Sequence, residues 1–343
     1  MDSLTQIALG AAVGVAVMRR RTAPWKSALW GAVAGTLPDL DVLVRHGDPI
    51  LDMVRHRAES HALFWLALLS VPLSAGVALV HREQALWRHW WWAMLLALIT
   101  HPLLDALTIY GTRLLLPFSD APLGVGSVFI IDPLVTLPWL AGTAWALAAR
   151  GSAAGLRANA IGLALGCAYL AAGAVVQLQV ESKARESLAA QGVRADRLLA
   201  TPVAFSIGLW RVLAVAGDHH YEGVHGLADA SGPIAFERFE RGAALDAELG
   251  QAHPRVQELR RFSCGFYEVR AVGNAVIVSD LRMGMAPNYT FSFEVARRAS
   301  ALQPLPVARS VGQRPDIAQA LPWWWRRLWG EPLPVPREDG SRG

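Results

Sequence analysis

The sequence predicts an α-helical integral membrane bundle of about six apolar segments, followed by a small α+β domain with an antiparallel sheet. Of the 343 residues, 53% are hydrophobic and only 17% are charged, whereas soluble domains carry about 25% charged residues. The deficit of charge is concentrated in the first half of the chain. After about residue 182, short alternating runs with turn signals replace the long apolar stretches.

Six apolar segments in the first half are candidate membrane helices. A helix needs about 20 residues to cross a bilayer, so the first segment is short. Proline or polar residues interrupt the second and fourth, which favours partly re-entrant segments there. The six segments are residues 4–18, 25–44, 61–80, 90–107, 128–149 and 158–180.

The loops between these segments predict their orientation. "RRRTAPWK", "HREQALWRH" and "RGSAAGLR" join segments one to two, three to four and five to six, and all are net positive. The loops 45–60 and 108–127 mix Arg with Asp and Glu. By the positive-inside rule the first set is cytoplasmic and the second faces outward. Six crossings then put both termini outside, which in a bacterium is the periplasm. A cleaved signal peptide is not expected, because the charges at 19–21 follow the apolar stretch.

The second half of the chain predicts a soluble domain. "ESKARESLAAQGVRADRLLA" has the pattern of an amphipathic helix leaving the membrane. In "FSCGFYEVRAVGNAVIVSDL", Phe262, Cys264 and Phe266 share one face of a period-two pattern, and "VGN" suits a tight turn. These features predict one small antiparallel sheet with one or two helices.

The predicted domain boundaries follow these changes of pattern. Residues 1–182 form the transmembrane domain, and residues 183–310 form the soluble domain, expected in the periplasm. Residues 311–343 form a tail in which "LPWWWRRLWG" mixes Trp with Arg. That mixture favours a membrane interface, and the last dozen residues are expected to be disordered.

Six ionisable residues lie at the ends of the apolar segments. An ionisable group at membrane depth is costly unless it is paired or lines a cavity, so each requires a reason. The expected topology puts the ends of segments two and four, and the beginning of segment three, at the outer side. All six residues therefore converge on one face of the membrane. They are Asp39, Asp41, His56, His61, His101 and Asp105.

The spacing of these residues indicates a metal site. His101 and Asp105 are four apart, which on a helix puts both on one stripe, so Asp105 either binds the same ion or orients His101. Asp39 and Asp41 follow Pro38, where a turn can aim both carboxylates the same way. Such a ligand mixture suits Zn²⁺, with Mn²⁺ or Mg²⁺ as alternatives. Taken singly, each residue is also explained as a helix cap, a solvated side chain or a histidine bonded to a backbone carbonyl.

Four stretches carry a family resemblance. "LPDLD" (37–41), "HRAESHA" (56–62) and "HPLLD" (101–105) match an LPDID-like stretch, HRGxTHS and HxxxD, and "YGTRLLLPFS" (110–119) is also similar. They resemble the YdjM-type membrane-bound metal-dependent hydrolases over residues 1 to about 180. The resemblance implies a metal centre made by all six ionisable residues. It also implies a distant relationship to zinc-dependent phospholipases C and similar all-α phosphoesterases.

Two departures from the family pattern bear on this centre. The family frequently has a histidine near the N-terminus where this chain has Gln6. Glutamine is a poor metal ligand, so either one ligand is missing or Asp2 takes its place. The Gly and Thr of HRGxTHS are Ala58 and Ser60 here, which is a milder change.

Several other polar residues have competing interpretations. Arg57 and Arg113, at the same outer face, either clamp a substrate phosphate or extend toward lipid headgroups. Asp132 is favoured as a helix cap over an outer contact of the metal site. "GDHHYEGVH" is favoured as a hairpin turn with exposed histidines over a second metal site. Its histidines are His219, His220 and His225.

These observations predict an inner-membrane metal-dependent hydrolase. Asp39 and Asp41 are the expected bridging or ligating carboxylates. His56, His61 and His101 are the expected imidazole ligands, and Asp105 is either a further ligand or the carboxylate that orients His101. The expected substrate is a phosphoester of a lipid or a lipid-linked phosphate, because the ligands open where headgroups lie, and paired ions suit phosphoester cleavage. The alternatives are a transporter using these ligands as a transit site, and a scaffold with a structural metal.

Composition excludes other classes. The net charge of +4 needs no nucleic acid to explain it, since basic loops also orient membrane proteins. The two cysteines, Cys167 and Cys264, give neither a disulfide framework nor a CxxC metal site. The expected partners are membrane lipids and the lipid-linked substrate.

Overall fold

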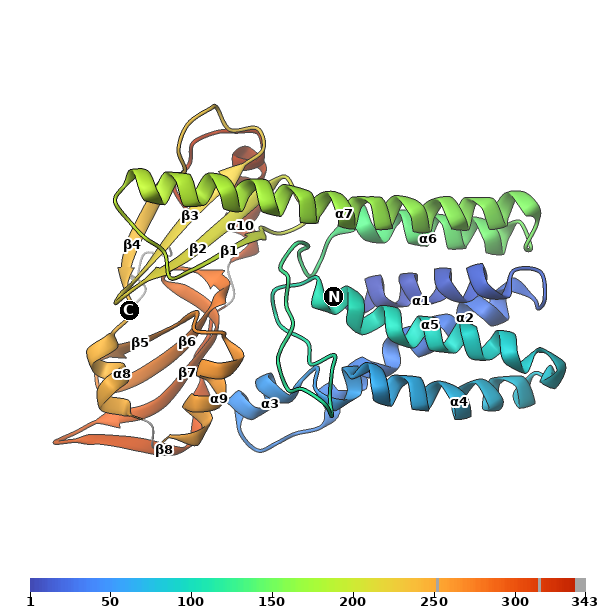
Figure 1. Ribbon diagram of the computed structural model, residues 1–343, viewed down its shortest axis with the longest axis horizontal. Helices are drawn as coiled ribbons and strands as arrows, with labels where there is room; N and C mark the ends of the chain where they lie inside the picture. Colours follow the sequence, from blue (N-terminus) through green and yellow to red (C-terminus); the bar gives the residue numbers. More distant parts are fainter. Residues whose placement is uncertain (251–252, 314–315, 337–343) are drawn as a thin grey trace. The chain divides into compact units, whose positions relative to one another are not determined.

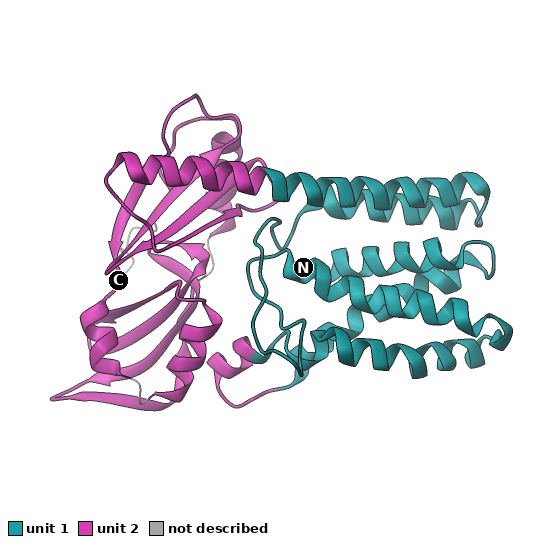
Figure 2. Cartoon of the chain, in the orientation of Figure 1, with its two compact units in different colours: residues 1–44, 55–175 teal, residues 45–54, 176–343 magenta. Residues whose placement is uncertain are grey.

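The chain divides into a helical part and a part built on two sheets. The structure is a computed structural model that describes residues 1–250, 253–313 and 316–336. Two compact units are present (Figure 2). Unit 1 comprises residues 1–44 and 55–175, and unit 2 comprises residues 45–54 and the chain from 176 onward. The predicted order, a helical N-terminal part followed by a domain with antiparallel strands, is confirmed.

Each of the six predicted apolar segments contains a helix (Figure 1). Short 3₁₀ helices follow α2, precede α4 and precede α5. Buried Trp90, Met94, Leu98 and Trp139 form the centre of the core of unit 1. The helices are α1 (Ser3–Met18), α2 (Pro24–Thr36), α4 (Leu63–Val80), α5 (Trp87–Ala106), α6 (Pro133–Ala148) and α7 (Ala153–Ala190), and the 3₁₀ helices are η1 (Leu37–Leu43), η2 (Glu59–His61) and η3 (Gln84–Leu86).

Only two of these helices are long and apolar enough to cross a membrane, so the expectation of about six crossings is corrected. In the described residues they are α4 and α7. Helices α1 and α6 have 16 residues each, about 24 Å at about 1.5 Å per residue, short of a hydrocarbon core about 30 Å thick. Helix α2 has 13 residues, and α5 carries Arg88 and Asp105 among its 20. Most residues of the two spans face outward, since only 28% and 22% of their apolar windows are buried.

Glycines allow the backbones of α1 and α2 to touch. A Cβ added at Gly10 would lie 2.2 Å from the carbonyl oxygen of Gly31, and one added at Gly31 would lie 2.1 Å from that of Gly10. Gly14 and Gly35 extend the contact by one helical turn in each direction. The close approach leads directly into η1, which continues from the end of α2.

Gly31→Val is expected to destabilise unit 1. The added side chain has no space against α1, and overpacking of this kind costs about 3 kcal/mol. The measurement is the thermal unfolding midpoint of the detergent-purified protein. Gly76→Val is the matched control, because Gly76 also lies in a helix but an added Cβ meets nothing within 4 Å. Equal midpoints for the two variants would contradict the packing argument.

Unit 2 contains two four-stranded antiparallel sheets where the sequence predicted one small sheet (Figure 1). The strand orders are β1-β2-β3-β4 and β5-β6-β7-β8, so every strand pairs with its neighbour along the chain. The strands are β1 (Arg197–Pro202), β2 (Leu209–Ala216), β3 (His219–Gly226), β4 (Phe236–Glu240), β5 (Tyr267–Val272), β6 (Ala275–Met285), β7 (Asn288–Arg298) and β8 (Leu302–Ser310), and the helices are α3 (Pro49–Arg55), α8 (Ala243–Leu249), α9 (Pro254–Phe262) and α10 (Ile317–Leu328).

One strand prediction in this unit is wrong and one turn prediction is confirmed. Phe262 is the last residue of α9, and Cys264 has a φ of 53°, so the apparent period-two pattern belongs to a helix end and a turn. The "VGN" turn does join β5 to β6, and Gly273 takes a positive φ of 59° there. The disorder expected of the last dozen residues falls in part outside the described residues, which end at 336.

Buried charged and polar groups connect the two sheets of unit 2. The guanidinium of Arg211 on β2 donates to Glu222 on β3 at 2.5 Å. Glu222 also accepts a hydrogen bond from the hydroxyl of Tyr289 on β7 at 2.6 Å. The ring of His220 lies 3.0 Å from the same hydroxyl. This core is therefore held by hydrogen bonds between buried polar groups as well as by apolar contacts.

Glu268, on β5, is expected to make stability depend on pH. Burial raises the pKa of its carboxyl to about 7, against the attraction of Arg270 and with a further contribution from Glu222. The native state then binds more protons than the unfolded chain between pH 4.5 and 7, so this group's contribution to the unfolding free energy falls as pH rises, by about 3 kcal/mol. Burial lowers the pKa of His220 to about 4, so His220 acts in the opposite direction between pH 4 and 6.5.

A comparison of variants separates the two groups. Glu268→Gln is expected to remove the Glu268 contribution, so its stability relative to the parent rises steadily from pH 4.5 to 7. The measurement is the unfolding midpoint at each pH, with Glu240→Gln as the control because Glu240 is exposed. A difference from the parent that does not change with pH would contradict the prediction.

The segment 45–54, which joins η1 to the chain before α4, is fixed within unit 2. Asp48 is buried and caps α3 by accepting the N–H of Ile50 at 2.9 Å. Its second carboxylate oxygen accepts the N–H of Ala308 at 3.0 Å and lies 2.9 Å from Nε of Arg255. The segment of chain between Asp41 and His56 is thus bound to β8 and α9.

Candidate metal centre

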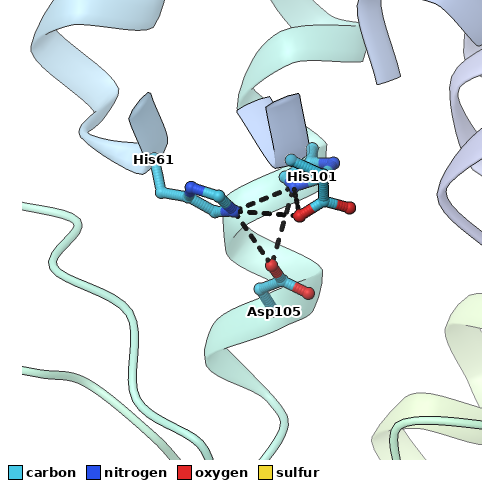
Figure 3. Close-up of side chains that lie close together, drawn as sticks. His61, His101 and Asp105 are labelled. Carbon is cyan, nitrogen blue, oxygen red and sulfur yellow. Dashed lines mark hydrogen bonds and ion pairs between the residues drawn. The ribbon is translucent and has the colours of Figure 1, made fainter. Parts of the chain in front are cut away.

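Four of the sequence-predicted residues meet in one group within unit 1. Asp39 comes from η1, His61 ends η2, and His101 and Asp105 lie one turn apart on α5. Each offers one ligand atom, and these atoms all lie within 4.8 Å of one another. Figure 3 shows the rings of His61 and His101 and the carboxylate of Asp105 turned toward one another. In the part of the chain that the structure describes, this is the one such group.

Five ligand-to-ligand distances within the group are close to the edges of a tetrahedron around one ion. The Nε2 atoms of His61 and His101 are 3.1 Å apart. Oδ1 of Asp39 lies 3.4 and 3.5 Å from them, and Oδ2 of Asp105 lies 3.3 and 3.6 Å from them. A tetrahedron with metal–ligand bonds of about 2.0–2.1 Å has edges of about 3.3 Å. The residues present therefore fit a small divalent cation.

Hydrogen bonds at the far side of each ring define the histidine tautomers. Nδ1 of His101 lies 2.6 Å from the carbonyl oxygen of Gly35, which only accepts, so Nδ1 carries the proton. Nδ1 of His61 lies 2.9 Å from the hydroxyl of Ser60, which itself donates to Asp41 at 2.6 Å, so this Nδ1 also donates. In the neutral rings both Nε2 atoms then present lone pairs to each other. A cation between them removes this conflict.

Asp41 and His56 lie outside the group of four and bond to each other. Nδ1 of His56 is 2.8 Å from Oδ1 of Asp41. Oδ2 of Asp41 accepts the hydroxyl of Ser60 and, at 3.0 Å, the N–H of Arg57. All the contacts of Asp41 therefore lie in the turn that carries His61. The structure places Asp41 where it orients a ligand.

Gln6, where the family frequently has a histidine, contacts Asp105 from the first helix. Its side-chain amide is buried and donates to Oδ1 of Asp105 at 3.1 Å and to the carbonyl oxygen of His101 at 3.3 Å. The amino group of Met1 forms an ion pair with the same Oδ1. Asp2 caps α1 by accepting the N–H of Thr5 at 3.1 Å, so it does not join the group. Sequence reasoning missed this role of Gln6, although a lone amide in an apolar helix was a signal for it.

The two arginines proposed for phosphate binding occupy different positions. Arg57 is buried, with Nε 3.1 Å from Oδ2 of Asp105 and Nη1 donating to Thr108 at 3.1 Å. Its guanidinium also lies over the ring of Tyr110, 4.9 Å from the centroid. Arg113 donates its backbone N–H to the carbonyl oxygen of Arg57 at 3.0 Å. The positive charge of Arg57 is therefore directed at a ligand carboxylate.

The remaining candidates lie elsewhere. Asp132 caps α6 by accepting the N–H of Leu134, which confirms that prediction. In the "GDHHYEGVH" stretch, Gly217 and Asp218 form the predicted turn between β2 and β3, and the rest of the stretch is strand β3. His220 in it is buried and stacks on Phe239, and His219 and His225 are half-buried, so the expectation that these histidines are exposed is wrong. His225 pairs with Asp229 at 3.2 Å.

Comparisons with known proteins support the membrane assignment. The family model described as "YdjM inner membrane protein" matches residues 1–180. The uncharacterized protein YfhP of Bacillus subtilis is 27% identical over 194 residues, which cover 55% of this chain and 58% of that protein. The chain thus matches little more than half the length of this relative. No solved structure matches the chain.

The matched residues include all four members of the ligand group and the whole network that orients them. They also contain helix α4 and most of α7, the two helices that can cross a membrane. The match covers more than half of the chain. The protein therefore belongs to the YdjM inner membrane protein family.

Proposed function

We propose that this protein is a metal-dependent hydrolase that cleaves a phosphoester of a lipid or lipid-linked substrate at the periplasmic face of the inner membrane. One observation carries the proposal. The Nε2 atoms of His61 and His101 face each other 3.1 Å apart, and the carboxylate oxygens of Asp39 and Asp105 lie 3.3–3.6 Å from them. Two imidazoles and two carboxylates in this arrangement are a donor set for Zn²⁺, with Mn²⁺ or Mg²⁺ as alternatives.

The residues in and around the ligand group have different roles. Asp105 is held by Gln6 and by Arg57, whose charge balances that carboxylate. Asp39 is the ligand that faces outward, because its side chain is 22% exposed while those of His61 and His101 are 0% exposed. A substrate phosphate is thus expected to approach from the side of Asp39. A divalent ion held by Asp39, His61, His101 and Asp105 would polarise a phosphoryl oxygen and would lower the pKa of a bound water molecule, which would supply the nucleophile.

The order of the helices supports the proposed orientation. The ligands lie after the end of α2, before the start of α4 and near the end of α5. The basic loops lie at the opposite ends, between α1 and α2, between α4 and α5, and between α6 and α7. The positive-inside rule assigns those loops to the cytoplasm. On this basis the ligand group is proposed to lie at the periplasmic side.

A structural metal in a membrane scaffold is the second candidate. The group offers four protein ligands, and structural zinc sites are closed by four protein ligands, whereas catalytic sites keep one position for water. The hydrolase requires Asp39 to yield its position or the ion to take a fifth ligand. The proposed relationship to zinc-dependent phospholipases C implies a catalytic metal, so it also requires a position for water at the ion.

The experiment begins with metal content per chain in detergent-purified protein, by elemental analysis. We expect one ion in the parent. Protein loaded with Zn²⁺ or Mn²⁺ is then assayed for release of phosphate or headgroup from phospholipids and lipid-linked phosphates in mixed micelles. Metal-dependent release supports the hydrolase. A stoichiometric metal without any release supports the scaffold, and absence of metal after reconstitution refutes both.

A further inference from the structure

Helix α10 presents an apolar stripe away from the protein. Four residues spaced by four, on the helix and at its C-terminal cap, are exposed by 74%, 47%, 55% and 67%. Successive residues of an α-helix are rotated by about 100°, so this spacing keeps all four on one side. They are Ile317, Leu321, Trp325 and Trp329.

The opposite face of α10 is fixed to unit 2. Arg327 is buried, forms an ion pair with Asp229 and donates to the carbonyl oxygen of Val224 on β3 at 3.1 Å. The side chain of Leu328 fills the space beside Gly208, and the ring of Trp324 packs edge-on against Phe205 at 5.6 Å. Figure 1 shows α10 beside the first sheet. The stripe is therefore held outward by a preformed contact on the other face.

Both positive charges of the helix are already neutralised. Nε of Arg326 donates to Glu331 at 2.7 Å, and Arg327 is paired with Asp229. The exposed surface of α10 is thus apolar and aromatic with little net charge. A partner that fits it offers apolar surface and a polar boundary for tryptophan, and does not need to be acidic.

We infer that the α10 stripe lies in the headgroup region of the bilayer and docks unit 2 on the membrane surface. Tryptophan is enriched at this boundary because its ring is apolar and its N–H is polar. Helix α7, a candidate membrane span, runs without a break into unit 2 at residue 176, so a bilayer is always within reach of α10. Because the charges are paired, the docking depends on apolar burial and is independent of anionic lipid.

The test is a depth measurement on the full chain in nanodiscs of phosphatidylcholine, with one copy per disc. In a background of Cys167→Ser and Cys264→Ser, a single spin label is attached through Leu321→Cys. The matched control is Gln319→Cys, which is also exposed but lies about 160° around the helix from Ile317. We expect the label at 321 to be immersed by about 5–10 Å, where oxygen reaches it and a water-soluble nickel complex does not. The label at 319 is expected to be reached by the nickel complex.

Three results would overturn the inference. Equal access of the nickel complex to both labels would show that the stripe stays in water. Protection of position 321 only in discs that hold two copies would assign the stripe to a second chain. Immersion that requires added phosphatidylglycerol would assign the docking to charge. None of these measurements depends on the metal centre.

Discussion

His101→Ala is expected to weaken metal binding on the order of a hundredfold, enough for the protein to lose its metal during purification, while the protein still inserts and folds. The substitution removes one of four ligands and leaves the lone pair of His61 without its opposing nitrogen. A four-ligand zinc site contributes about 10–16 kcal/mol, so one ligand is worth about 3 kcal/mol, or on the order of a hundredfold in affinity. The measurements are metal per chain by elemental analysis and the Kd by competition with a chelator of known affinity.

The matched control for this variant is His89→Ala. His89 lies on the same helix, α5, near its other end and outside the ligand group. We expect His89→Ala to retain the metal content of the parent. Removal of metal is also expected to lower the unfolding midpoint of the parent and of the control, but not that of His101→Ala. Full metal occupancy in His101→Ala would refute the assignment of the site.

Asp41→Asn is expected to weaken metal binding by about tenfold, less than His101→Ala does, because Asp41 is not in the ligand group. The carboxylate accepts from both His56 and Ser60. An amide has one oxygen, so it leaves one of these donors facing an NH₂ group. If that donor is Ser60, its hydroxyl turns toward Nδ1 of His61, and the proton of that ring moves to Nε2. A protonated Nε2 does not bind metal.

The affinity of Asp41→Asn distinguishes the possible roles of Asp41. A loss as large as that of His101→Ala would make Asp41 a direct ligand, as the sequence resemblance implied. An unchanged Kd would show that the Ser60 contact does not control the His61 ring. Asp52→Asn is the control. Asp52 lies nearby in the sequence, but its carboxylate accepts the N–H of His46 and does not belong to the ligand group.

The positions of the helices could be predicted from sequence because apolar runs are local. The number of crossings could not, since it depends on where each helix ends. The chain after Thr36 turns into the 3₁₀ helix η1, which shortens α2 to 13 residues. The same turn determines which of Asp39 and Asp41 faces the histidines. The sequence spacing predicted that six residues lie close together. Their separation into a group of four and the Asp41–His56 pair depends on side-chain contacts, which sequence spacing does not determine.

The fold of unit 2 was harder to predict, because the pairing of its strands cannot be recognised within a single stretch of sequence. Phe262 and Phe266 alternate with polar residues like a strand, yet α9 ends at the first of them. The buried partners Arg211 and Tyr289 lie on different sheets, and nothing in their local sequence links them. Turns such as Gly273–Asn274 were predictable, because glycine there takes a positive φ.

The anchoring of Asp48 has a consequence for the order in which the protein is assembled. Asp39 precedes the anchored segment and His61 follows it, while the anchors on the other side are Arg255 and Ala308, the latter 260 residues further along the chain. During synthesis all four ligand residues emerge long before either anchor. A chain that stops before residue 255 contains all four ligand residues, but the segment between Asp39 and His61 lacks both anchors. The segment between Asp39 and His61 therefore gains these contacts only after most of the chain has been made.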